Sequence, residues 1–556
     1  MLSFLLEKYR ALFAGDPETP NAKPRREIFF YADFNLGALL SLGARLRGGR
    51  PCACDESRRP RAGAFNFAVP LTFDDGVEWV FRAPSSRYAA PQGDPGRILA
   101  SEAATLRYIR ENSDVPVPEV FDYSDTYDNE VGIPYILMSK AAGHPLATYE
   151  WRTHPHKTPR TNGAAIARAL TDSEKAKILR QLGRVARQLS SLRFPAIGSV
   201  FEGDEGFVVG ECLHPGYVLG GRVTLEDLRR GPFHREEDFY SALATALGLH
   251  AEQLPMGHHV LRAPVPVPQE YDSFEKYCTA TDRRNDFAAL GGLVNSSENR
   301  LEYCLVSHLL QDLVVPAMTQ APSRSVPGFP LQHHDLSLEN IFVDEELNIT
   351  CIIDWSFCST VPQAQLLSVP GLPHVRDLIS DPALISAFRS GYEAENKKRG
   401  GRRVEPEDWK AGEVVSHFMR VVNLDALQDH SHLQALLDLI RGPVPAGHEE
   451  SDAGGLPAIL RAWASMKDSL TLADGLAFHE EHDSVARQQE KEYFDTVGPD
   501  RLALAQKVAL AAKMNLSFVA DSRLWRWIDA VMEDRDGRGP GEWEDDVADW
   551  TVVGRN

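Results

Sequence analysis

Three oxygen-bearing side chains between positions 335 and 354 have the types and spacing that could hold a divalent ion beside a reacting hydroxyl. Asp335 and Asn340 lie in the segment His-His-Asp-Leu-Ser-Leu-Glu-Asn at 333–340, and Asp354 lies in Ile-Ile-Asp-Trp at 352–355. Carboxylate and amide oxygens are ligands that Mg²⁺ accepts beside phosphates, and a separate carboxylate can accept the proton of an attacking hydroxyl. Together they indicate phosphoryl transfer, whereas each alone would also fit a loop hydrogen bond or a strand cap.

A short hairpin is the element that must bring Asn340 and Asp354 together. Mostly apolar residues occupy 341–343 and 349–353, and the mainly polar residues 344–348 between them are typical of a turn. Antiparallel pairing brings the two strand ends to within roughly 5 Å of each other, so the two side chains can share one ion. Asp335, just before Asn340 in the sequence, would lie beside the same ion.

A second hairpin, on either side of Asp74-Asp75-Gly76, fixes the position of the Arg82 side chain. Residues 65–73 alternate apolar and polar, Asp74-Asp75-Gly76 supplies a turn, and the alternation resumes through residue 81. If those three residues form the loop, Phe73 faces Val77 and the apolar sets of the two strands coincide. Arg82 then lies opposite Ala68, on the side of the sheet away from the core.

The helix expected after this hairpin carries an acidic residue on its apolar stripe. Leu99, Glu102, Leu106 and Ile109 recur at helical spacing. A carboxylate that points inward needs a cation, because an unpaired buried charge is expensive, and Arg82 is the nearest one offered. We predict an Arg82–Glu102 ion pair; the alternative is a glutamate that reaches solvent at the helix edge.

The changing pattern along the chain predicts an α+β protein with two lobes. We expect an N-terminal extension over 1–60, a small β-rich N-lobe over 61–140 that closes with a buried strand at 135–138, and a larger, mostly helical C-lobe over 141–375. Residues 151–170 indicate an insertion. Residues 376–530 should add helices, with apolar stretches near 414–439 and 502–532, before an acidic tail over 531–556.

Composition excludes several classes of protein. The 556 residues carry a net charge of −20, which argues against general binding to nucleic acid or to an anionic membrane. No apolar run is long enough to cross a bilayer, and no secretory signal opens the chain. Seven cysteines without regular spacing favour a reducing compartment, so we expect a cytoplasmic protein whose oligomeric state stays open.

Two residue pairs resemble metal ligands and are interpreted otherwise. Cys52 and Cys54 have no second cluster at zinc spacing. His333 and His334 are neighbours in an extended segment, so their side chains would point apart, which favours structural roles over shared ligation.

These motifs together resemble the aminoglycoside phosphotransferase family, a group of protein-kinase-like small-molecule kinases, over about residues 60–370. The likeness is carried by Gly-Ala-Phe-Asn at 63–66 as a nucleotide loop, Trp-Val-Phe-Arg at 79–82, Ser-Glu at 101–102, and the two segments at 333–340 and 352–355. The resemblance implies a kinase-like bilobal fold. It departs from the usual pattern in having Arg82 where kinases place lysine, and in a nucleotide loop poor in glycine.

The resemblance also implies a role for each matching residue. Asp335 would be the catalytic base, with Asn340 and Asp354 as Mg²⁺ ligands. Arg82 would contact the α- and β-phosphates of the nucleotide with Glu102 as its partner. The remaining nucleotide contacts would come from Asn66 in the loop and from a hinge at Met138 to Lys140.

We therefore predict ATP-dependent transfer of a phosphoryl group to a hydroxyl of a small molecule, with GTP as the alternative nucleotide and an acceptor pocket among residues 200–320. The competing hypothesis is a kinase-like binding or scaffold protein without strong catalysis, motivated by Arg82 and the atypical loop. A protein kinase fits less well, because no Asp-Phe-Gly and no activation segment follow Asp354.

Overall fold

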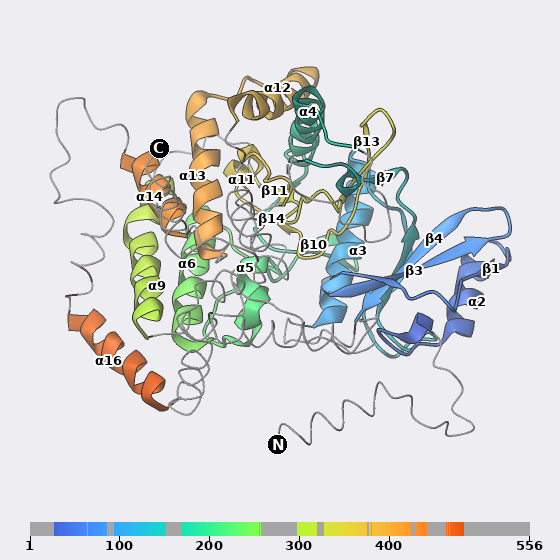
Figure 1. Cartoon of the computed structure of the whole chain (residues 1–556), viewed down its shortest axis with the longest axis horizontal. Coiled ribbons are helices and arrows are strands. Elements are labelled where there is room, and N and C mark those ends of the chain that lie inside the picture. Colours follow the sequence, from blue (N-terminus) through green and yellow to red (C-terminus); the bar gives the residue numbers. More distant parts are fainter. Residues whose placement is uncertain are drawn as a thin grey trace, which may run out of the picture.

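The structure is a computed structural model that describes residues 27–63, 65–85, 94–151, 168–254, 256, 297–319, 327–374, 377, 379, 381–423, 429–441, 463, 465 and 467–482. An antiparallel sheet with its helices forms one side of the molecule, and a larger, mainly helical part forms the other (Figure 1). The predicted α+β fold with two lobes is confirmed. The boundaries proposed for the individual segments stay predictions.

The N-lobe is built on a six-stranded antiparallel sheet. Its strands lie in the order β1-β3-β4-β6-β5, and β2 pairs with the free part of β3. The strands are β1 (Cys52–Ala53), β2 (Arg61–Ala62), β3 (Asn66–Phe73), β4 (Glu78–Pro84), β5 (Val120–Ser124) and β6 (Tyr135–Ser139).

Strands β3 and β4 pair in the predicted register. The Phe73 amide donates to the Val77 carbonyl at 2.9 Å, and Ala68 lies opposite Arg82. Phe67 and Phe81 point to the other face, where they are buried beneath the helix α2 (Leu36–Leu46) and the short 3-10 helix η1 (Glu27–Phe29). Segments ahead of residue 60 thus cover one face of the sheet, because its apolar side chains would otherwise meet water.

The opposite face of the sheet carries α3 (Pro95–Asn112). Asp94 caps the helix by accepting from the Gly96 amide, and Pro95 suits the first turn, where no amide donor is needed. Leu99 and Ala103 pack on Ile136 and Met138 of β6. The side of the sheet that holds Arg82 therefore faces a helix rather than solvent.

The C-lobe combines helices with short strand pairs. Its first elements are β7 (His144–Pro145), η3 (Leu146–Thr148), α4 (Asp172–Leu189), β8 (Arg193–Phe194), β9 (Val200–Gly203), β10 (Gly206–Val209), α5 (Pro215–Val218), η4 (Leu219–Thr224) and α6 (Glu236–Gln253). After the gap come α9 (Ser297–Leu309), a π-helical turn η6 (Leu310–Val314), α10 (Val315–Thr319), β11 (Phe329–Gln332), β12 (Ile341–Val343), β13 (Ile349–Ile352), β14 (Ser359–Thr360) and α11 (Gln363–Leu367). The predicted insertion at 151–170 lies largely outside the described residues.

The last described helices are α12 (Pro382–Lys398), α13 (Pro406–Val422), α14 (Asp429–Arg441) and α16 (Lys467–His482). The predicted helical stretch near 414–439 is two helices, because α13 ends at Val422 and α14 contacts it to bury leucines in the same core. The stretch at 502–532 and the acidic tail lie outside the described residues.

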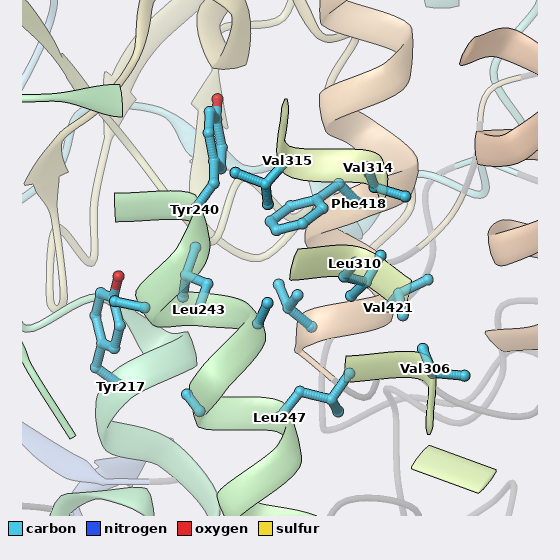
Figure 2. Close-up of a cluster of buried hydrophobic side chains, with 14 of the residues drawn as sticks. Tyr217, Tyr240, Leu243, Leu247, Val306, Leu310, Val314, Val315, Phe418 and Val421 are labelled. Atoms are coloured by element: carbon cyan, nitrogen blue, oxygen red, sulfur yellow. The ribbon is translucent and has the colours of Figure 1, made fainter. Parts of the chain in front are cut away.

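The largest C-lobe core lies between α6, the α9–η6 segment and α13 (Figure 2). Leu243 and Leu247 of α6 meet Leu310 of η6 and Phe418 of α13, and all four side chains are fully buried. Burying each such side chain stabilises the fold by about 1.5–3 kcal/mol, so this core supports the C-lobe.

Helices α4 and α12 cross at two glycines. A Cβ on Gly183 would lie 2.1 Å from the Phe388 carbonyl oxygen, and one on Gly391 would lie 1.9 Å from the Arg180 carbonyl oxygen. The backbones approach so closely that only hydrogen fits at either position.

We expect Gly391→Ala to lower the free energy of unfolding by about 1–3 kcal/mol, because the added methyl forces the helices apart. The control is Gly475→Ala on α16, where no atom lies within 4 Å of the Cβ position and alanine should gain about 1 kcal/mol in helix propensity. Urea unfolding of both variants checks this. An unchanged midpoint for Gly391→Ala would show that the crossing is looser than described.

Candidate active site

Arg82 is the centre of a buried ionic cluster that joins the two lobes. Its Nη1 donates to both carboxylate oxygens of Glu102, which confirms the predicted ion pair. Its Nη2 donates to Asp354 Oδ1 and to Ser356 Oγ, the latter at 3.1 Å. The side chain of Glu102 is only 1% exposed and that of Arg82 12%, so the alternative of a solvent-reaching glutamate is wrong.

Burial and charge set the ionisation of this cluster. Burial raises the pKa of Glu102, while Arg82 opposes that shift. Burial alone would also raise the pKa of Asp354, but Arg82, followed by His333 and Ser356, outweighs it and holds the pKa of Asp354 below its usual value. Asp354 is therefore ionised at neutral pH, as a metal ligand must be.

Ser356 completes the cluster and was missed by the sequence analysis. Its hydroxyl accepts from Arg82 and donates to Glu102 Oε2 at 2.8 Å. It is buried between the two charged groups. A single hydroxyl two residues after Asp354 carries no pattern from which the sequence could have predicted this contact.

The backbone at Asp354 directs its carboxylate toward Arg82. Asp354 has φ 62° and Phe357 has φ 61°, both in the left-handed region. Aspartate tolerates this conformation better than most residues, and strained backbone of this kind is common at functional sites. The chain thus turns sharply as it leaves β13, and Asp354 Oδ1 faces β4.

Asp335 and Asn340 form a second cluster. Asn340 Nδ2 donates to the Asp335 carbonyl at 2.9 Å and to Asp335 Oδ2 at 3.1 Å. His333 accepts the Asp335 amide at Nδ1, so its Nε2 carries the proton and donates to the Ile353 carbonyl at 2.9 Å. The structural role expected for His333 is confirmed.

The hairpin of β12 and β13 unites the two clusters as predicted. Ile341 lies opposite Ile352, and the Ile353 amide donates to the Asn340 carbonyl at 2.9 Å. Asp354 follows directly, so it and Asn340 leave the same end of the hairpin. Asp335, Asn340, Asp354 and Arg82 thus lie in one region between the lobes.

Asn340 and Asp354 fit a Mg²⁺ site that relies on a substrate for its other ligands. The Asn340 amide nitrogen is used by Asp335, which leaves Oδ1 as the atom that would bind a cation, and the side chain of Asp354 is 38% exposed. Within the described part of the chain, no cluster of three His, Cys, Asp or Glu side chains could hold an ion by itself. Two protein ligands supplemented by phosphates and water are usual for Mg²⁺.

The other predicted nucleotide residues lie in the N-lobe but outside the ionic cluster. Asn66 begins β3, and its carbonyl accepts the Gly63 amide at 2.9 Å. Met138 is buried on β6, and Lys140 lies just beyond that strand, half-exposed and paired with Glu78. No described contact tests their roles.

Two histidine rings, the buried His214 and the partly buried His334, lie beside Asp335. His334 Nε2 is 2.7 Å from Ser359 Oγ, and its ring centroid is 4.3 Å from that of His214. Burial lowers the pKa of His334 and, with Arg222, lowers that of His214 to about 3. Both rings are neutral near pH 7, and His214 is a neighbour of the site that the sequence did not indicate.

A paired cation on a strand, a buried helix glutamate and an Asp-Asn-Asp set at one end of a C-lobe hairpin are the pattern of the kinase-like class of phosphotransferases. The chain belongs to the phosphotransferase enzyme family APH, whose model matches residues 58–365. The resemblance found in the sequence is thereby confirmed.

Two curated fungal proteins show how far the likeness extends. A subtelomeric hrmA-associated cluster protein of Aspergillus fumigatus is 28% identical over 343 residues, which cover 58% of this chain and 61% of that protein. Altered inheritance of mitochondria protein 9, mitochondrial, of Yarrowia lipolytica is 26% identical over 219 residues, 37% of this chain and 36% of that protein. The chain thus spans less than two thirds of the length of these relatives.

Solved structures match more distantly. Macrolide 2′-phosphotransferase MphH of Brachybacterium faecium is 15% identical with a TM-score of 0.34, over 74% of this chain and 98% of that one. A thermostable mutant of aminoglycoside phosphotransferase APH(4)-Ia is 12% identical with a TM-score of 0.30, over 77% and 100%. The family assignment therefore rests on the sequence match over residues 58–365.

We expect Arg82→Met to lower the free energy of unfolding by about 3 kcal/mol, because Glu102 would stay buried without its cation. The matched control is Arg45→Met, which removes an exposed pair with Glu130 and should cost at most about 1 kcal/mol. Urea unfolding measures both. Equal losses in the two variants would contradict a special role for the buried pair.

His214 should make stability depend on pH. Its pKa is about 3 in the folded chain, whereas an unfolded histidine titrates near 6.5, so only the unfolded state takes up this proton between those values. Stability is therefore complete above about pH 6.5 and falls with decreasing pH by up to about 1.4 kcal/mol per unit. Unfolding free energies between pH 7 and pH 5 should show a shallower slope for His214→Asn than for the exposed control His234→Asn.

Proposed function

We propose that this protein transfers the γ-phosphoryl group of ATP to a hydroxyl group of a small molecule. The observation that carries the proposal is the hydrogen bond from Asn340 Nδ2 to Asp335 Oδ2, which holds a carboxylate beside a residue that can ligate Mg²⁺. GTP is the alternative nucleotide.

In the proposed reaction, Asp335 accepts the proton of the acceptor hydroxyl. The hydroxyl oxygen forms a bond to the γ-phosphorus, and the bond between that phosphorus and the oxygen bridging to the β-phosphate breaks, which releases ADP. His333 fixes the Asp335 backbone and Asn340 fixes its carboxylate, so the base is oriented before the acceptor arrives.

Asn340 and Asp354 would hold Mg²⁺, which when bound neutralises the charge of the phosphates. Arg82 would contact the α- and β-phosphates while Glu102 keeps it in place, and the loop at Asn66 would cover them. We place the adenine near Met138 to Lys140. The Lys140 amide donates to the Glu78 carbonyl at 3.4 Å, so carbonyl groups are the better candidates for contacts there.

We also propose that the reaction takes place in the cytoplasm. The six described cysteines are free thiols, as in a reducing compartment. Among the described helices, none is long and apolar enough to cross a bilayer.

We expect Asp335→Asn to reduce turnover by about 10²- to 10⁴-fold, because the base is lost while the side chain keeps its shape. A screen of hydroxylated metabolites with γ-labelled ATP and Mg²⁺ supplies the assay, and Asp227→Asn, an exposed aspartate, is the control. Parent-like turnover in Asp335→Asn would refute the mechanism.

Thermal shift distinguishes the enzyme from a scaffold. Stabilisation by ATP that requires Mg²⁺ supports the enzyme, since a ligand that binds only the folded state raises the melting temperature. A well-folded protein that responds to no nucleotide would support the scaffold instead.

A further inference from the structure

We propose that the C-lobe hairpin of β9 and β10 is a clamp that positions helix α3, and through Glu102 positions Arg82, for the nucleotide. The inference rests on the proposed function and identifies Arg107, Glu202 and their neighbours as positioning residues. They lie away from the phosphates and act through α3.

Charged contacts tie the hairpin to the N-lobe at two places. Arg107 of α3 donates from Nη1 to both carboxylate oxygens of Glu202, at 2.9 and 3.0 Å, and Tyr123 of β5 donates to Glu202 at 3.1 Å. In the first turn of α3, Arg97 donates to Glu211, which follows β10, at 2.8 Å. Glu102 lies between Arg97 and Arg107 on the helix.

Aromatic contacts accompany these ion pairs. The Tyr108 ring packs edge-on against Phe207 of β10, with centroids 5.1 Å apart, and against Phe194 at 4.7 Å. The Arg97 guanidinium lies 5.6 Å from the Phe201 ring centroid. The hairpin thus contacts α3 over several turns, and the contacts differ in chemistry.

The base of the same hairpin is bonded to the segment that follows Asp354. Ser199 Oγ donates to the Cys358 carbonyl at 3.0 Å, and the Thr360 amide donates to the Gly198 carbonyl at 2.8 Å. A Cβ on Gly198 would lie 2.2 Å from the Gly210 carbonyl oxygen, so the base of the hairpin is tightly closed. One rigid unit therefore contacts both the helix that carries Glu102 and the loop that carries Asp354.

This arrangement explains how the Arg82 cluster is held from two sides. Sheet contacts alone fix only one face of α3, through Leu99 and Ala103. The other face packs on C-lobe residues that include Ile352 and Trp355, on either side of Asp354. The clamp sets the angle of α3 between these two surfaces.

The test compares two ion pairs on one helix. Glu202→Gln loosens the clamp, whereas Arg110→Met removes a pair with Glu119 that lies within the N-lobe, at 2.9 Å. We expect Glu202→Gln to raise the Kd for Mg·ATP about fivefold and Arg110→Met to leave it unchanged, because only the first contact joins α3 to the hairpin. The double exchange Arg107→Glu with Glu202→Arg should restore part of the affinity.

Amide hydrogen exchange over residues 97–110 gives a readout that needs no nucleotide. Exchange should increase in Glu202→Gln and not in Arg110→Met, with both melting temperatures near that of the parent. Unchanged exchange and affinity in Glu202→Gln, or equal effects in both variants, would overturn the clamp. A parent protein that binds neither Mg·ATP nor Mg·GTP would instead refute the proposed function and the nucleotide-positioning role, while exchange would still decide whether the hairpin holds α3.

Discussion

A guanidinium group that leaves water must exchange its hydration for anions, and Arg82 does so with partners from both lobes. Glu102 comes from α3 and Asp354 from the loop after β13, 272 residues from Arg82 along the chain. The register of β3 with β4, the periodicity of α3 and the turn at Asp354 all have to agree for these groups to meet. The positions of the candidate base and metal ligands depend on that agreement.

The parts of this arrangement that depend on local patterns could be predicted from the sequence. Apolar and polar residues alternate on either side of Asp74-Asp75-Gly76, and this pattern fixes which residue of β4 faces Ala68. If the pairing of the two strands shifted by one position, the apolar side chains of one strand would all face solvent. The pairing of Glu102 with Arg82 could be predicted because a carboxylate on the buried face of a helix needs a nearby cation. The hairpin that joins Asn340 to Asp354 follows from two apolar runs and a polar turn.

Other parts depend on contacts between distant segments, and they carry no pattern of their own. Ser356 is a single hydroxyl, and nothing in its neighbourhood indicates that it bridges Arg82 and Glu102. His214 reaches His334 only because α5 begins beside the segment at 333–340. The strands β9 and β10 are four residues each, and neither their pairing nor their contact with α3 follows from hydrophobic periodicity.

The forked guanidinium of Arg82 has a consequence for how the two lobes are held together. A lysine carries one point charge, whereas the two Nη atoms of Arg82 reach Glu102 and Asp354 at the same time. Arg82 therefore opposes the repulsion between the two carboxylates, by which Asp354 adds to the effect of burial in raising the pKa of Glu102. One side chain therefore cross-links the two lobes, and any separation of the lobes at this point has to break a charged hydrogen bond of Arg82.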